Sequence, residues 1–165
     1  MRAFIALNIS DKGKTEIENI LSLIDENKFR KVKKENLHIT MRFLDEINEE
    51  NADEIKKKIQ KIKFKEFEIE LNGIKSFGTR VLWIDVIKGK EKIIELNKKL
   101  DSAGIKDKKF HPHLTIARNK NASLNEINSL IEKLNKQRLL VKEKIFSIDL
   151  MKSELKAGRP EYNLL

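Results

Sequence analysis

Stretches with strand-like alternation and stretches with helical periodicity follow one another along this chain almost without interruption. Its 165 residues include only two prolines and six glycines, and no segment rich in glycine and serine separates them. Successive elements must therefore connect through short turns. A chain of this length can bury an ordinary core, so we expect residues 1–165 to form a single domain.

Two periodicities predict the elements. Alternating apolar residues predict strands at 2–9, 37–44, 64–71, 80–87, 113–117, 141–153 and 160–165. Apolar residues at helical spacing predict four helices, which follow Ser10, begin near Asn48, span residues 90–102 and follow Ser123. Because adjacent strand pairs alternate with helices, we expect an α+β fold with antiparallel sheets and not a doubly wound parallel sheet.

Composition excludes several classes of protein and leaves one question open. The absence of cysteine excludes disulfides, thiolate chemistry and cysteine-based metal sites. No apolar run approaches the roughly 18 residues of a membrane helix, and we interpret the apolar start of the chain as a strand and not as a signal peptide. We expect a cytoplasmic monomer without membrane contact. A net charge of +9 suggests a polyanionic partner such as nucleic acid, but lysines interleaved with glutamates are also typical of heat-adapted proteins.

Histidine and threonine are rare here, yet they occur together. Only three histidines and four threonines are present, and His38 and His113 each have a threonine two residues later. Chance would produce this about twice in a thousand sequences. Residues i and i+2 of a strand point to the same face, so Thr40 accompanies His38 and Thr115 accompanies His113. Each half of the chain thus has a strand, a helix and then a His-x-Thr strand, as a duplicated two-lobed architecture would.

The same alternation assigns the neighbouring residues to faces. Met41 and Phe43 are expected to point into the core. Arg42 is expected on the face of Thr40, where it would meet a substrate phosphate or a neighbouring base. The alternative for Arg42 is a solvated arginine at the end of a strand.

An imidazole beside a hydroxyl is suited to phosphoryl chemistry. Imidazole titrates nearest neutrality, and a threonine hydroxyl can donate a hydrogen bond to a phosphoryl oxygen. Two such pairs on opposite sides of one phosphorus would supply a base behind the attacking oxygen and an acid behind the leaving oxygen. Alternatively, each pair only satisfies a hydrogen bond within its strand.

His111 allows a second interpretation of the histidines. His-x-His is a metal-ligand spacing, and His38 would complete a three-histidine zinc site with His111 and His113. That site would leave both threonines unexplained, so we expect a supporting or surface role for His111.

Two segments resemble the signatures of a known family. Residues 36–44, NLHITMRFL, and residues 110–118, FHPHLTIAR, are similar to the two motifs of the RNA 2′,3′-cyclic phosphodiesterases, historically called 2′-5′ RNA ligases. These enzymes are two-histidine phosphoesterases. The likeness covers nearly the whole chain, including its first strand, residues 80–83 and a C-terminal hairpin at 153–162.

The resemblance implies a fold and a function. The fold would be two pseudo-symmetric lobes of antiparallel sheet flanked by helices, with the active-site cleft between them. The reaction would be hydrolysis of an RNA-terminal 2′,3′-cyclic phosphate to a 2′-phosphate, without a metal ion or other cofactor. RNA ends or cyclic nucleotides would be the substrates. His38 and His113 would be the catalytic pair, and Thr40, Thr115 and Arg118 would bind the phosphate.

Some features fit less simply. Strict alternation puts Arg118 on the face opposite His113, so a phosphate contact requires a bulge or the end of the strand. Asp45 stands where a turn glycine is common in the family, and aspartate tolerates turn conformations. Trp83 and Phe77 are more typical of a core, although either could stack on a base.

Two other functions remain open from the sequence. One is an RNA-binding protein that keeps the cleft but catalyses little, which the intact histidines disfavour. The other is the joining of RNA ends through a 2′-5′ linkage in the same cleft. No nucleotide-activating lysine motif is recognisable, which disfavours an ATP-driven ligase.

Overall fold

The computed structural model describes residues 1–106 and 109–165. Along the chain, the elements are β1 (Arg2–Asn8), α1 (Asp11–Leu21), β2 (Phe29–Lys31), the 3₁₀ helix η1 (Lys34–Asn36), β3 (His38–Glu46), α2 (Glu49–Gln60), β4 (Phe67–Phe77), β5 (Val81–Lys88), α3 (Lys90–Ser102), β6 (His113–Asn119), α4 (Leu124–Asn135), β7 (Val141–Ile145), β8 (Asp149–Lys156) and β9 (Arg159–Leu164).

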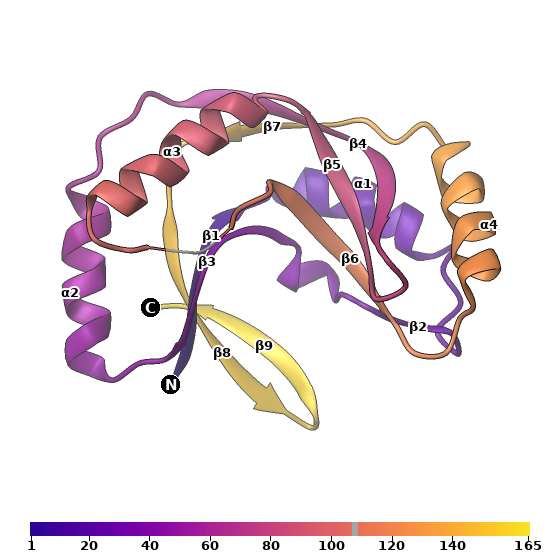
Figure 1. The fold of residues 1–165 in the computed structure, drawn as a ribbon, viewed down its shortest axis with the longest axis horizontal. Coiled ribbons are helices and arrows are strands. Elements are labelled where there is room, and N and C mark those ends of the chain that lie inside the picture. Colours follow the sequence, from indigo (N-terminus) through magenta and orange to yellow (C-terminus); the bar gives the residue numbers. More distant parts are fainter. Residues whose placement is uncertain (107–108) are drawn as a thin grey trace.

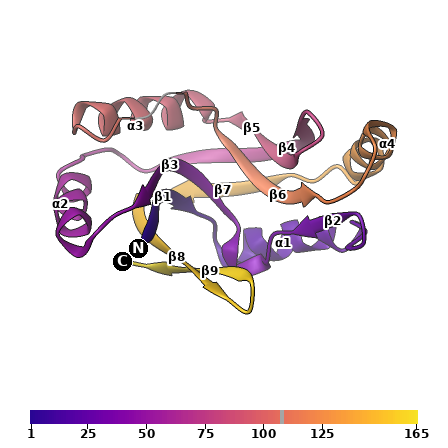
Figure 2. The ribbon, with the colours of Figure 1, turned by 60° about the horizontal axis from the view of Figure 1, so that its bottom comes forward.

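These strands form one curled antiparallel sheet (Figures 1 and 2). Its order is β7-β4-β5-β6-β3-β1-β8-β9, and β2 pairs with β6 beside the main path. The first half of the sheet, β9-β8-β1-β3, meets the second half, β6-β5-β4-β7, where Ile39 of β3 pairs with Leu114 of β6. The predicted α+β class with antiparallel strands and two lobes is confirmed, and the lobes are halves of one continuous sheet.

The two halves repeat the same order of elements. β1, α1, β3 and α2 of the first half correspond to β5, α3, β6 and α4 of the second. In each half, the strand that carries His-x-Thr lies at the junction with the other half. The repeat expected from the sequence is therefore present, and it brings the two His-x-Thr strands next to each other.

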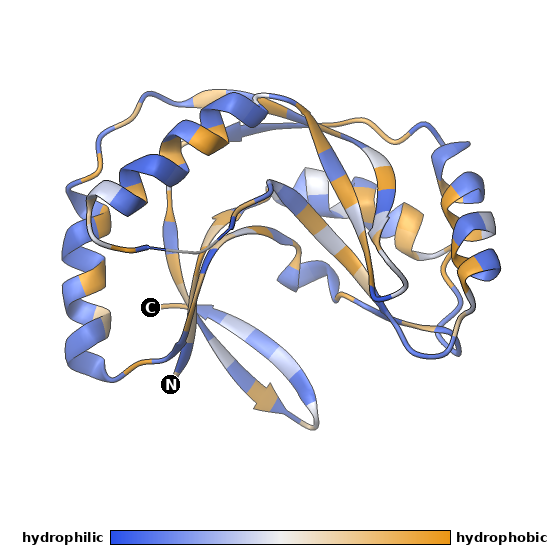
Figure 3. Ribbon diagram, in the orientation of Figure 1, coloured by the Kyte–Doolittle hydropathy of each residue, from blue (hydrophilic) through white to orange (hydrophobic). Residues whose placement is uncertain are grey.

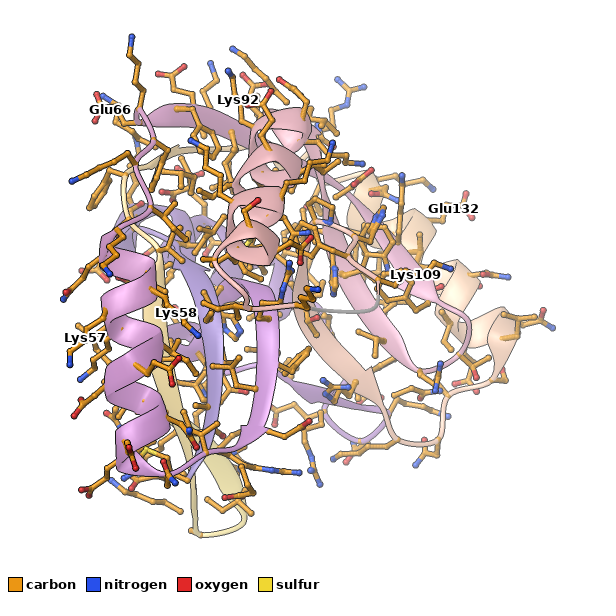
Figure 4. The ribbon with its side chains drawn as sticks, turned by 60° about the vertical axis from the view of Figure 1, so that its left-hand side comes forward. Lys57, Lys58, Glu66, Lys92, Lys109 and Glu132 are labelled. Atoms are coloured by element: carbon orange, nitrogen blue, oxygen red, sulfur yellow. The ribbon has the colours of Figure 1, made fainter. Side chains whose placement is uncertain are left out.

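The helices bury one side each and expose charge on the other. α1 buries Ile17, Ile20 and Leu21 in the core, and hydrophobic residues lie along the strands and the inner helix faces (Figure 3). On the outer faces, Lys57 of α2 and Glu132 of α4 extend into solvent (Figure 4). No helix within residues 1–106 or 109–165 is long and apolar enough to span a membrane.

A buried carboxylate joins α1 to the far edge of the sheet. Glu143 of β7 accepts hydrogen bonds from the Ser10 hydroxyl at 2.7 Å and from its backbone N–H at 3.2 Å. The Ser10 hydroxyl in turn accepts from Gly13 N at 3.1 Å and caps the helix. A side chain at Gly13 would collide with this carboxylate, which explains the glycine inside α1. Glu143 thus connects the helix of the first half to the edge strand of the second.

Several strand boundaries differ from the prediction. β4 runs to Phe77, beyond the expected end at residue 71, because Gly73 has φ 85° where the register shifts and the strand continues past it. The expected strand 141–153 is two strands, since β7 pairs with β4 and β8 pairs with β1, and the chain crosses between the halves from 146 to 148. The short β2 had too little alternation to be predicted.

Candidate active site

A cleft of about 830 Å³ is lined by residues from both halves of the sheet. His38 and Thr40 of β3 line it together with His113 and Thr115 of β6. The two strands run antiparallel through the Ile39–Leu114 pair, so His38 lies toward Thr115, and Thr40 toward His113. The structure therefore brings both predicted His-Thr pairs to one place.

The imidazole of His38 is held from two sides. Its Nδ1 lies 2.6 Å from the carbonyl oxygen of Asn36, and its Nε2 lies 2.8 Å from the Thr40 hydroxyl. A carbonyl can only accept, so Nδ1 carries a proton. In the neutral ring, the lone pair then lies on Nε2, where the Thr40 hydroxyl can donate to it.

His113 repeats this arrangement on the other half. Its Nδ1 lies 2.6 Å from the carbonyl oxygen of His111, again two residues earlier in the chain. The proton is fixed on Nδ1 for the same reason, and Nε2 of the neutral ring can accept a proton. Both histidines therefore have the tautomer in which Nε2 of the neutral ring is unprotonated and can accept a proton.

Burial lowers the pKa of both histidines. For His38, burial is the main cause and the positive charges of Lys14 and His113 add to it, while the Asn36 carbonyl acts in the opposite direction. For His113, burial is again the main cause, and repulsion from His111 and Arg118 adds to it. Both pKa values lie below the ordinary histidine value, so both rings are mainly neutral at neutral pH.

Each His-x-Thr strand has a bulge directly after its threonine. In β3, Ile5 of β1 pairs with Arg42 and Ala6 pairs with Thr40, so Met41 is an extra residue. In β6, Leu82 of β5 pairs with Ala117 and Trp83 with Thr115, which leaves Ile116 as the extra residue. A bulge reverses the faces of all residues that follow it.

In β6, the bulge turns Arg118 into the cleft. Arg118 lines the cleft with His113 and Thr115, although unbroken alternation would place it on the opposite face. The bulge that a phosphate contact by Arg118 required is thus present.

In β3, the bulge removes Arg42 from the cleft, so the expectation that it meets substrate was wrong. Its side chain is 1% exposed, which also excludes the solvated alternative. Its guanidinium donates to the carbonyl oxygens of Ile105 at 3.1 Å and Asn97 at 3.1 Å, and to the Asp101 carboxylate at 2.7 Å. A further hydrogen bond joins it to the Asn97 side chain. Arg42 therefore fixes α3, and the segment that follows it, to β3.

The same bulge explains why Phe43 does not lie where it was predicted. It was expected in the core, but its side chain is 70% exposed and lines the cleft. Met41 is buried as expected. Asp45 has φ 54°, which fits the turn conformation expected of it.

Of the two aromatic residues considered for base stacking, Trp83 belongs to the core. It is 5% exposed and stacks on Phe77, with ring centroids 4.6 Å apart. Phe77 is partly exposed, lines the cleft and meets the ring of His113 edge-on at 5.0 Å.

The described structure gives no support to the three-histidine zinc site considered for His38, His111 and His113. Across the residues that the structure describes, no three histidine, aspartate or glutamate side chains are grouped to hold a metal ion.

Three residues beside His38 were not predicted as part of the site. Phe4 packs on His38 with ring centroids 4.8 Å apart, and Tyr162 of β9 approaches both rings edge-on. Asn36 is buried and donates from Nδ2 to the carbonyl oxygen of Pro160 at 2.9 Å, which ties the β8–β9 hairpin to the segment before His38. Pro160 lies 124 positions along the chain from Asn36, and a contact over that separation leaves no local pattern in the sequence.

Positive charge surrounds the cleft. Among its described lining residues, Glu26 is the one acidic side chain. The basic ones are Arg30, Lys31, Lys33, Lys109, Arg118, Lys120 and Arg159. Lys31 is paired with Glu26 at 3.2 Å. Such a rim attracts a polyanion that is longer than a single phosphate.

Comparison with known proteins gives consistent similarities. The sequence profile described as the 2′-5′ RNA ligase superfamily matches residues 10–156. An RNA 2′,3′-cyclic phosphodiesterase of Archaeoglobus fulgidus is 34% identical over 127 residues, which cover 72% of each chain. Another of that name, from Aquifex aeolicus, is 30% identical over 179 aligned positions and covers 100% of this chain and 95% of its own.

A solved structure shows the same fold. The crystal structure of Escherichia coli LigT complexed with ATP superposes with a TM-score of 0.80 at 21% identity. The match covers 99% of this chain and 94% of LigT.

Proposed function

This chain belongs to the 2′-5′ RNA ligase superfamily, and we propose that it is an RNA 2′,3′-cyclic phosphodiesterase. The substrate is an RNA end or nucleotide with a 2′,3′-cyclic phosphate, and the product carries a 2′-phosphate. The single observation that most supports this proposal is the pair of His-x-Thr strands, one from each half, whose four side chains line one cleft.

The proposed reaction uses one neutral and one protonated imidazole. The neutral ring takes a proton from water at Nε2 as the water oxygen attacks phosphorus. The bond between phosphorus and the ribose 3′-oxygen breaks, and the protonated ring donates its Nε2 proton to that departing oxygen. The phosphate remains on the 2′-oxygen. The fixed Nδ1 protons orient both rings for these transfers.

Hydrogen-bond donors in the cleft would bind the negatively charged non-bridging oxygens of the phosphate. The hydroxyls of Thr40 and Thr115 and the guanidinium of Arg118 are the groups that would hold its non-bridging oxygens. These donors stabilise the charge that develops as the bond breaks. The reaction as proposed needs no metal ion, because the histidines transfer the protons and Arg118 supplies positive charge.

The decisive test is incubation of an RNA oligonucleotide ending in a 2′,3′-cyclic phosphate with the protein in excess EDTA. We expect opening to continue, with the phosphate on the 2′-oxygen. A 3′-phosphate product would contradict the proposed bond cleavage. Loss of turnover in EDTA, with recovery on addition of zinc, would contradict the proposed metal independence.

A further inference from the structure

Two arginines face each other across the β2–β6 pair. Arg30 of β2 pairs directly with Arg118 of β6, and the register on both sides of this pair is regular. Directly paired residues of an antiparallel ladder have their side chains side by side on one face, about 5 Å apart. Both arginines are exposed, and both line the cleft. The cleft thus has two neighbouring guanidinium groups, of which the proposed reaction uses only that of Arg118.

Neither arginine is neutralised by an acidic side chain. Within the described part of the chain, Arg30 and Arg118 form no ion pair and no side-chain hydrogen bond, whereas the nearby Lys28 and Lys31 are each paired with a glutamate, at 2.7 and 3.2 Å. Like charges that face each other directly across a ladder destabilise it. A bound anion removes this repulsion, and a guanidinium binds phosphate through two parallel hydrogen bonds. Arg30 therefore has the surroundings of an anion ligand.

The position of Arg30 indicates which phosphate it meets. β2 pairs with β6 only from Ala117 to Asn119, at the end of β6 that lies away from His113. Arg30 is consequently one strand beyond Arg118, at a strand spacing of about 5 Å. A phosphate at Arg30 is thus a second phosphate and not the reacting one. At an RNA end, the phosphate next to the cyclic one is the phosphodiester on the 5′-oxygen of the terminal nucleotide.

We propose that Arg30 binds the phosphodiester on the 5′ side of the terminal nucleotide. This inference rests on the proposed function, because it adds a second phosphate site for the same RNA substrate. Lys31 and Lys120 also line the cleft but are less suited, since their amino groups already contact Glu26. A phosphate contact carries no base information, so this site distinguishes an RNA chain from a cyclic mononucleotide without selecting a sequence.

The test compares variants of Arg30 on substrates that differ in the second phosphate. The substrates are uridine 2′,3′-cyclic phosphate, the same nucleotide with a 5′-phosphate, a uridine dinucleotide ending in the cyclic phosphate, and that dinucleotide with a neutral methylphosphonate linkage. Arg30→Gln should raise KM for the ordinary dinucleotide about 5- to 50-fold with little change in kcat. Arg30→Lys keeps the charge but loses the paired hydrogen bonds, so its KM should lie between the two. KM for the methylphosphonate dinucleotide and for the nucleotide without a 5′-phosphate should be the same in all variants.

Arg138 provides a matched control, because it is exposed and lies outside the cleft lining. Arg138→Gln removes the same charge and should leave every KM unchanged. If Arg30→Gln raised KM equally for the charged and the neutral dinucleotide, Arg30 would act through the fold of β2 and the proposal would fail. A loss confined to the 5′-phosphorylated mononucleotide would assign the site to free nucleotides and would also overturn it.

Failure of the proposed function would look different. In that case the wild-type protein would open none of the four substrates. The Arg30 site would then be decided by binding titrations with an open uridine dinucleotide that carries a terminal 2′-phosphate, and with its methylphosphonate counterpart. Arg30→Gln should weaken binding of the first ligand only, and Arg138→Gln should weaken neither. Equal affinity of the wild-type protein and Arg30→Gln for the charged dinucleotide would reject the site.

Discussion

In each cleft histidine, the Nδ1–H group donates a hydrogen bond to the carbonyl oxygen of the residue two positions earlier, and this bond fixes the tautomer of the ring. It leaves Nε2 as the atom that exchanges protons in both His38 and His113. Burial at the same time lowers the pKa of both rings. A reaction that needs one ring protonated and one neutral is therefore favoured at slightly acidic pH in the free protein.

The pH dependence follows from these directions. Both pKa values lie below about 6.5, the ordinary histidine value, so kcat/KM should be bell-shaped with its maximum below that pH. A bound anionic phosphate favours the protonated rings and raises both pKa values. The maximum of kcat should therefore lie at higher pH than the maximum of kcat/KM. Steady-state kinetics on a cyclic mononucleotide would measure both, and a kcat/KM maximum on the alkaline side of kcat would contradict the assignment.

Replacing the histidines tests whether they act as a pair. His38→Ala and His113→Ala should each lower kcat by about 10² to 10⁴, the usual contribution of general acid–base catalysis. The double variant should lose far less than the product of the two losses, because residues that act together are not additive. His111→Ala is the matched control and should be mild. An active His38→Ala beside an inactive His111→Ala would show that the pair is wrongly assigned.

Arg118 was placed correctly from the sequence and Arg42 was not. The histidines, the threonines and Arg118 were found from spacing and from the family motifs, and they lie in one cleft. Arg42 was predicted to face the cleft and Phe43 the core, but the structure shows the reverse. The prediction assumed strict alternation across a bulge, and the hydrophobicity of the residues does not reveal that bulge. A phosphate contact by Arg118 was already expected to require a bulge or the end of the strand. Had the same bulge been assumed after Thr40, Arg42 would have been placed away from the cleft.

Arg42 acts between elements, where it joins β3 to α3 and to the chain that leaves α3. Arg42→Met removes the donor from three backbone carbonyls, from the Asn97 side chain and from Asp101, so it should destabilise the fold by about 2–4 kcal/mol. The folded fraction should keep a near-normal KM, since Arg42 does not line the cleft. Denaturant unfolding and kinetics at low temperature would separate these effects. A stable variant with a strongly raised KM would restore Arg42 as a substrate ligand.

Elements were predicted correctly where a periodic pattern extends over many residues. They were missed where a strand is defined by its pairing with a distant strand. The helices near residues 11, 49, 90 and 124 were found from their caps and apolar spacing. β2 has three residues, too few for a period, and it exists because it pairs with β6. The break between β7 and β8 has no local signal either, since it arises where the chain passes from one half of the sheet to the other.

For the molecule as a whole, the site exists only where the two halves meet. The pair Ile39–Leu114 joins them, and these residues directly follow His38 and His113 in the chain. Glu143 adds a second link between the halves through α1. The repeat of elements was predicted from the sequence, but the continuous sheet was not, because nothing within either half specifies the strand at its edge.

The net charge of +9 was ambiguous in the sequence, and its distribution at the cleft makes it testable. Basic side chains outnumber the one acidic side chain among the described lining residues. An RNA strand that crosses this rim releases counterions, and each neutralised phosphate should contribute about 0.7 to the slope of log affinity against log salt. A cyclic mononucleotide reaches only the phosphate site and should show a much flatter slope.

Kinetics of an RNA oligonucleotide and a cyclic mononucleotide over a range of salt concentrations would measure this difference as the slope of log kcat/KM. Lys33→Ala and Arg159→Ala change residues of the rim, so each should reduce the slope for the oligonucleotide and leave the slope for the mononucleotide unaltered. Lys57→Ala is the matched control, because Lys57 extends into solvent from the outer face of α2 (Figure 4). It should change neither slope. Equal slopes for both substrates in the wild-type protein would mean that the lysines and arginines serve solubility or heat tolerance and do not bind RNA.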